Sequence, residues 1–237
     1  MRIAVLDFGY VEAIEHWGAG DAVGVADYER GIIEAARQST QGSFRGWEQD
    51  AKLLAHLYKN NHATPFEFAG MVIEVRAPIF VFREWHRHRT QSYNEMSARY
   101  APLPDVNYVP TVERLMIGGG ANKQAGAVKD SADLTERAAA RFQEQLQLHY
   151  ERAEQLYLEA LADGTPKELA RLCLPMGRYS QMRAQASLRN WLAFLTLRMD
   201  PKAQWEIRQY ANAVGQLVAN AFPQTWALYS SPPKGPM

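Results

Sequence analysis

The most informative stretch of this sequence reads Arg87-His88-Arg89-Thr90-Gln91-Ser92-Tyr93-Asn94-Glu95-Met96-Ser97-Ala98-Arg99-Tyr100. It places three arginines, a histidine, a glutamate, two serines and an asparagine within fourteen residues, more polar groups than a hydrophobic core can satisfy. Arginine matches phosphate and carboxylate oxygens two at a time, and serine hydroxyls complete such an anion site. A glutamate among them indicates a hydroxyl or amine on a second part of the ligand. The stretch therefore predicts a nucleotide site.

Composition narrows the class of protein. The chain has 237 residues, enough for a substantial hydrophobic core. Its 26 basic and 26 acidic side chains give a net charge of zero, so the protein as a whole has no electrostatic field of one sign. The single cysteine, Cys173, excludes an internal disulfide and a multi-cysteine metal site. The opening apolar run is too short for a signal peptide, and no stretch approaches the roughly twenty apolar residues of a membrane span. We expect a soluble, cytoplasmic protein with no membrane partner.

Hydrophobic periodicity predicts a mixture of strands and helices. The strands are expected at 2–8, 66–75 and 179–188, and the helices at 28–38, 47–60, 79–88, 133–162, 167–173, 190–198 and 202–222. Pro78 suits the first turn of the helix that delivers Arg87 to the site. A strand from Tyr93 onward would put Glu95, Ser97 and Arg99 on one face. Prolines and glycines in 101–131 predict a mobile excursion.

The signature resembles that of the flavin-dependent thymidylate synthases. All nine fixed positions of R-H-R-x-x-S-x-N-E-x-S-x-R-Y are present, at Arg87, His88, Arg89, Ser92, Asn94, Glu95, Ser97, Arg99 and Tyr100. Upstream, the segments at 62–67 (HATPFE) and 77–81 (APIFV) resemble further family elements. Downstream, 170–175 (ARLCLP), Leu197-Arg198 and 203–207 (AQWEI) look like its later landmarks. The resemblance covers most of the chain.

The resemblance implies a fold and a reaction. The fold would be α+β, with an antiparallel sheet flanked by helices, in a single domain spanning residues 1–237. The protein would be a homotetramer whose sites are shared between subunits. It would convert dUMP to dTMP with 5,10-methylenetetrahydrofolate as carbon donor, FAD as redox cofactor and NADPH as reductant. Methylation at C5 of uracil can instead use an enzyme cysteine as covalent activator. Cys173, flanked by leucines and with no adjacent base, favours the flavin route.

The resemblance also implies roles for particular residues. Arg198 would be catalytic, stabilising charge that develops on the pyrimidine. The residues implied for dUMP are Glu84, Trp85, His86, Arg87, Glu95, Met96, Ser97, Ala98, Arg99, Arg171 and Arg198. Those implied for FAD are Ser39, His62, Thr64, Arg87, His88, Arg89, Glu95, Ser187, Leu188, Arg189 and Ala193. Four positions depart from the family pattern: Glu84 replaces the usual glutamine, Ser187 and Ala193 replace asparagines, and Phe68 replaces a common histidine.

Other interpretations of the same residues stay open. His86 and His88 could form a metal pair, but no third ligand has suitable spacing, so we expect no metal site. Ser92-x-x-Glu95 fits a helix capping box, and Arg83 with Arg87 fits a solvated helix face. A non-catalytic nucleic-acid or nucleotide-binding module is the competing class, although zero net charge argues against it. A flavoprotein with another acceptor is the third possibility.

Overall fold

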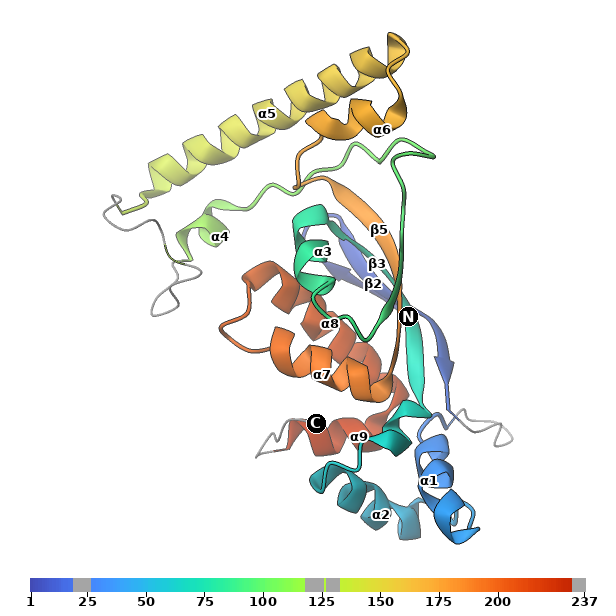
Figure 1. The fold of residues 1–237 in the computed structure, drawn as a ribbon. Helices are drawn as coiled ribbons and strands as arrows, with labels where there is room; N and C mark the ends of the chain where they lie inside the picture. Colours follow the sequence, from blue (N-terminus) through green and yellow to red (C-terminus); the bar gives the residue numbers. More distant parts are fainter. Residues whose placement is uncertain (19–26, 118–125, 127–132, 232–237) are drawn as a thin grey trace. The chain divides into compact units, whose positions relative to one another are not determined.

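In a computed structural model, the chain forms a five-stranded antiparallel sheet and a set of helices (Figure 1). The structure describes residues 1–18, 27–117, 126 and 133–231. The strands, in the order β1-β2-β3-β5-β4, are β1 (Arg2–Val5), β2 (Gly9–Trp17), β3 (Gly70–Pro78), β4 (Ser92–Glu95) and β5 (Tyr179–Ser187). The predicted α+β class with an antiparallel sheet is confirmed.

The helices account for most of the remaining described residues. They are α1 (Arg30–Arg37), α2 (Trp47–Lys59), α3 (Ile79–Trp85), α4 (Val112–Met116), α5 (Glu136–Ala162), α6 (Lys167–Ala170), α7 (Leu188–Arg198), α8 (Trp205–Ala221) and α9 (Pro223–Ser230). Short 3-10 turns lie at Gln38–Thr40, Thr64–Glu67 and Arg171–Cys173. None of the described helices is long and apolar enough to cross a membrane.

The chain divides into two compact units. Unit 1 comprises Met1–Arg76, Glu84–Glu95 and Gln181–Met237, and unit 2 comprises Ala77–Arg83 and Met96–Ser180. Each unit is therefore built from segments that are distant in sequence. The expectation of one domain over residues 1–237 stays a prediction.

The core of unit 1 lies between β3 and the C-terminal helices. Met71, Ile73 and Val75 alternate along β3 and are fully buried, as the period of a strand predicts. The Trp191 indole of α7 donates to the Met71 carbonyl at 3.1 Å, and the Tyr210 hydroxyl of α8 donates to the Arg76 carbonyl at 2.9 Å. These contacts hold α7 and α8 on the sheet, and α8 also packs on β1 and β2.

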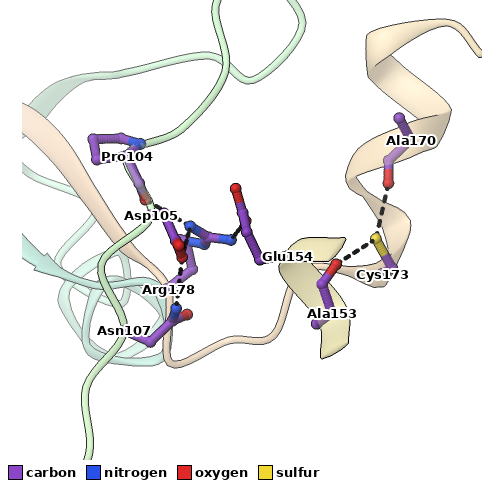
Figure 2. Close-up of polar contacts among 8 residues, drawn as sticks. All are labelled: Pro104, Asp105, Asn107, Ala153, Glu154, Ala170, Cys173 and Arg178. Carbon is purple, nitrogen blue, oxygen red and sulfur yellow. Dashed lines mark hydrogen bonds and ion pairs between the residues drawn. The ribbon is translucent and has the colours of Figure 1, made fainter. Parts of the chain in front are cut away.

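A buried arginine organises unit 2. Arg178, just before β5, is fully buried and donates to the Pro104 carbonyl at 2.8 Å, to Asp105 at 2.9 Å and to Glu154 of α5 (Figure 2). Asn107 donates to the same Asp105 at 3.4 Å and is bridged to Arg178 through the backbone. One guanidinium therefore ties the segment at 104–107 to α5 and to the start of β5.

The segment at 101–117 is more ordered than the sequence predicts. It contains α4, and Leu103 and Tyr108 are buried. The expected excursion is therefore wrong for residues 101–117, because backbone bonds such as Tyr108 N–H to the Gly177 carbonyl replace a free loop. Residues 118–125 and 127–132 lie outside the described residues.

Three element boundaries correct the sequence prediction. Residues 64–67 form a 3-10 turn, so the strand starts at Gly70, and Pro78 ends that strand. The following helix stops at Trp85, three residues early. The strand β2 escapes prediction because a register shift between Ala13 and Glu15 breaks its alternation. The helix α9 was also not predicted.

The predicted strand from Tyr93 to Tyr100 ends at Glu95. β4 pairs with β5 only from Ser92↔Gln185 to Glu95↔Met182. Beyond it, the Ser97 hydroxyl accepts the Arg99 N–H at 3.3 Å, and the Ser97 carbonyl accepts the Tyr100 N–H at 3.0 Å. Such local bonds offer the backbone an alternative to a sheet ladder and close a turn. Ser97 and Arg99 therefore do not share a strand face with Glu95.

Candidate active site

Arg198, the last residue of α7, is held by three hydrogen bonds. Its Nε donates to His88 Nε2 at 2.8 Å, one terminal nitrogen donates to Glu84 Oε2 at 2.8 Å, and the other donates to the Glu84 carbonyl at 2.8 Å. The buried start of α7 explains the position, because Leu188 N–H donates to the Ala69 carbonyl and anchors the helix on the sheet. The fold thus brings together three predicted site residues, with Arg198 more than a hundred positions from the other two.

His88 is neutral in this arrangement. Burial and, second, the adjacent charge of Arg198 lower the pKa of His88 from 6.5 to about 4. Since Arg198 Nε can only donate, His88 Nε2 must accept, which places the imidazole proton on Nδ1. The ring also packs edge-on against Phe194, with centroids 4.8 Å apart. His88 therefore acts as a fixed neutral acceptor.

Three charged residues of the signature, Arg87, Arg89 and Glu95, have no side-chain partner among the described residues. Arg87 and Arg89 are exposed and Glu95 is half-buried. Within the described part of the chain, none of the three side chains makes a hydrogen bond or ion pair. Unpaired guanidinium groups beside an ordered site are available to anionic oxygens of a ligand.

Other residues predicted here serve the core. The Trp85 side chain is fully buried, its indole donates to Gln91 Oε1 at 3.1 Å, and it packs on Phe194. The Trp85 side chain is therefore not open to a ligand. His86 is part-buried, with Nε2 lying 3.2 Å from Met182 Sδ. Among the described residues, no three His, Cys, Asp or Glu side chains gather as a metal site would require.

Two of the residues predicted for FAD line one hollow. It has a volume of about 300 Å³, and its walls are formed by Ala35, Ala36, Leu57, His62, Thr64, Pro65 and Phe68. His62 and Thr64 line it directly. The Ser39 hydroxyl donates to the carbonyl of the wall residue Ala36 at 3.1 Å. Phe68, where a histidine is expected from the resemblance to be common, is 58% exposed and makes this wall apolar.

The start of α7 carries the remaining residues predicted for FAD. The Ser187 hydroxyl is buried and has no hydrogen-bond partner among the described residues. Arg189 is exposed and forms an ion pair with Glu67 of the HATPFE segment. Leu188 is fully buried and Ala193 is half-buried, so neither offers a polar side chain. This cluster thus provides one orphan hydroxyl and one arginine to a ligand.

The other residues predicted for dUMP gather in unit 2. Arg99 Nε lies 3.1 Å from Glu168 Oε2, and Arg171 Nε donates to the Glu168 carbonyl at 3.3 Å. Lys167 Nζ donates to the Tyr100 carbonyl at 3.1 Å. The turn after β4 and the helix α6 therefore lie side by side. Met96 and Ser97 are half-buried, whereas Ala98 is buried and would contact a ligand only through its backbone.

Glu168 and Lys167 were missed by the sequence reasoning. Both are exposed and stand immediately before the ARLCLP segment, which was the only available signal. Their importance depends on a contact across about seventy residues, between 99–100 and 167–168. Glu168 supplies the carboxylate that pairs with Arg99.

Comparison with known proteins identifies the family of this chain. A family model described as "Thymidylate synthase complementing protein" matches residues 23–224. A flavin-dependent thymidylate synthase of Thermus thermophilus is 37% identical over 97% of this chain and 78% of its own length. That of Thermotoga neapolitana is 32% identical over 97% of this chain and 94% of its own length.

Solved structures give the same result. The UMP/dUMP methylase PolB from Streptomyces cacaoi, bound with 5-Br dUMP, is similar with a TM-score of 0.79 and 29% identity, over 96% of this chain and 97% of that one. Its complex with 5-Br UMP is similar with a TM-score of 0.77 and 30% identity, over 97% of this chain and 96% of that one. By the extent of the family match and the identity to these relatives, this chain belongs to the thymidylate synthase complementing protein family, whose members include the flavin-dependent thymidylate synthases.

Proposed function

We propose that the protein is a cytoplasmic flavin-dependent thymidylate synthase that methylates dUMP to dTMP. It would use 5,10-methylenetetrahydrofolate as carbon donor, with FAD reduced by NADPH. The observation that carries the proposal is the complete nine-position signature at 87–100 in a chain of this family, with Arg198 placed against His88 of that signature. A binding module alone would not require a histidine held neutral by burial and by an adjacent arginine.

The residues of unit 1 fit a dinucleotide such as FAD. Arg87 and Arg89 are exposed and unpaired within the described chain, as residues awaiting a pyrophosphate would be. The orphan Ser187 hydroxyl offers a donor to a polar ring edge. When bound, the flavin would supply hydride transfer between the nicotinamide and the nucleotide. The chain itself would hold the cofactor with Arg87, Arg89, His62, Thr64 and the Ser187 region.

The chain's own groups would bind and polarise the nucleotide. In unit 2, Ser97, Arg99 and Arg171 have the donors that suit a phosphate, and in unit 1, Arg198 has the guanidinium that suits the pyrimidine. A preorganised guanidinium stabilises negative charge as it develops on the ring, at no reorganisation cost in the transition state. His88 would keep that guanidinium in place as a neutral acceptor. Cys173 is not required in this scheme.

We also propose a homotetramer. Phe142, Leu148 and Leu156 of α5 are each about half exposed. Exposed apolar side chains on one long helix suit contact with another subunit. Sedimentation of the wild type and of Leu156→Glu tests this, with a reduced mass expected for the variant.

A second candidate substrate comes from the similarity to PolB, which is a UMP/dUMP methylase. The test is to purify the protein, record its visible flavin spectrum, and incubate it with dUMP or UMP, the folate and NADPH. We expect a yellow protein that forms dTMP. A colourless protein that forms no methylated nucleotide would refute the proposal, and methylation of UMP at a similar rate would favour the second candidate.

A further inference from the structure

Arg198 is held by two residues, the neutral His88 and the charged Glu84. Three of its five N–H groups are used, one by the neutral His88 ring and two by Glu84. Its side chain is only 16% exposed, whereas that of Glu84 is 41% exposed. A half-buried guanidinium held at three points cannot rotate freely, so two N–H groups remain for a ligand in a fixed plane.

Glu84 binds Arg198 through two separate groups. Its carboxylate takes one terminal nitrogen and its own backbone carbonyl takes the other. The carbonyl belongs to the last turn of α3 and would stay in place if the side chain changed. The carboxylate adds a charge that the carbonyl lacks, and an adjacent opposite charge weakens the attraction of Arg198 for any other anion.

We propose that Glu84 is a positioning residue for Arg198, and that its carboxylate sets both the orientation of the guanidinium and the net positive charge presented to the pyrimidine. This inference rests on the proposed function, which assigns the pyrimidine to Arg198. Orientation and charge are separable, because glutamine keeps an acceptor oxygen without the charge and alanine keeps neither.

The two roles predict different results for two variants. Glu84→Ala should lower kcat for dTMP formation about ten- to a hundredfold while the KM for dUMP changes less than about threefold, since a misplaced donor is felt most in the transition state. Glu84→Gln should restore most of kcat. Glu12→Gln is the matched control, because Glu12 also pairs with an arginine, Arg2, at the far edge of the sheet.

A binding measurement reports the charge without turnover. The probe is 5-fluoro-dUMP, whose fluorine makes the ring N3–H more acidic and whose ultraviolet spectrum shows ionisation. Titrating the bound probe with pH should show a lower ring pKa in Glu84→Gln than in the wild type, by about half a unit to one unit, or a three- to tenfold preference for the anion. Glu12→Gln should match the wild type.

The possible outcomes separate this inference from the proposed function. Unchanged kcat in Glu84→Ala, together with the same ring pKa in all proteins, would overturn the role of Glu84 and leave the proposed function intact. A kcat loss in Glu84→Ala that glutamine does not restore would overturn the positioning role. Failure of the wild type to bind 5-fluoro-dUMP would overturn the proposed function and this inference with it. If Glu84→Ala does not fold, the ring pKa in the isosteric Glu84→Gln decides.

Discussion

At the scale of the residue, the neutral state of His88 makes part of the stability depend on pH. The pKa of His88 is lowered to about 4 in the folded chain by burial and then by Arg198, while an unfolded histidine titrates near 6.5. Between these values the unfolded state binds more protons, so the free energy of unfolding falls as pH falls. The stability that neutral His88 contributes is fully present above about pH 6.5 and is lost by about pH 4.

The titration of His88 should change the free energy of unfolding by about 2 to 3 kcal/mol, because one pKa unit corresponds to about 1.4 kcal/mol. Urea unfolding at pH 7 and pH 4.5 measures it in the wild type, in His88→Gln and in the exposed control His149→Gln. The pH effect should shrink by that amount only in His88→Gln. An identical pH effect in all three proteins would show that His88 is not held neutral.

Cys173 should be dispensable for turnover. Its thiol is half-buried and donates weakly to the Ala170 carbonyl at 3.2 Å and the Ala153 carbonyl at 3.5 Å (Figure 2). Both partners are backbone acceptors, and no base contacts the sulfur in the described residues. Cys173→Ala should cost about 1 kcal/mol or less of unfolding free energy and keep most dTMP formation. A folded, yellow variant without activity would make the thiol catalytic.

The sequence was sufficient to name side chains at this scale but not their partners. The signature pointed to His88, and the Leu197-Arg198 segment pointed to Arg198. Neither pattern contains the bond between them, because 110 residues separate the two positions. The role of Glu84 was equally hidden, since a glutamate on a helix is most simply explained as a solvated charge until α7 brings an arginine to it.

At the scale of the element, Arg178 should be critical for holding together the segments that surround β5 in unit 2. The guanidinium is fully buried, while Glu154 is only 14% exposed. Arg178→Met fills a similar volume but leaves Glu154 without its cation. Removing one partner of a buried pair costs about 3 to 5 kcal/mol. Urea unfolding should show this loss, with the exposed Arg152→Met near the wild type; a loss below about 1 kcal/mol would contradict it.

The contact between the turn after β4 and α6 predicts opposite effects on dUMP affinity. Arg99→Ala should weaken binding about ten- to a hundredfold, since a charge-assisted hydrogen bond contributes about 1.5 to 3 kcal/mol. Glu168→Gln should strengthen binding slightly, because it frees Arg99 from an exposed pair of low intrinsic value. Calorimetry measures both, with flavin content as the control. Unchanged affinity in Arg99→Ala would remove it from the phosphate site.

Element prediction succeeded where periodicity was long and failed where local bonds competed. The 27 residues of α5 and the alternating β3 were both foreseen, since each repeats its pattern over several turns or pleats. The strand beyond Glu95 was wrong because the Ser97 hydroxyl and carbonyl close a turn that alternation cannot reveal. The register shift in β2 likewise interrupts the alternation of apolar and polar residues from which this strand could have been predicted.

At the scale of the whole molecule, the chain should unfold in a single step. It passes between the two units four times, and β3 and β5 run through the boundary without a break. All six tryptophans belong to segments of unit 1, whereas the long helix α5 belongs to unit 2. Tryptophan fluorescence and helical circular dichroism should therefore give coincident urea curves. Two separate midpoints would show that the units unfold independently.

The same chain path sets an order of events during synthesis on the ribosome. The segments of unit 2 end at Ser180, so all of them are translated before the last segment of unit 1. β3, by contrast, waits for β5 as its sheet neighbour and for α7 and α8 to cover its buried face. The first 76 residues therefore leave the exit tunnel with apolar side chains of β3 exposed to solvent. These side chains are buried only after the C-terminal helices have been synthesised.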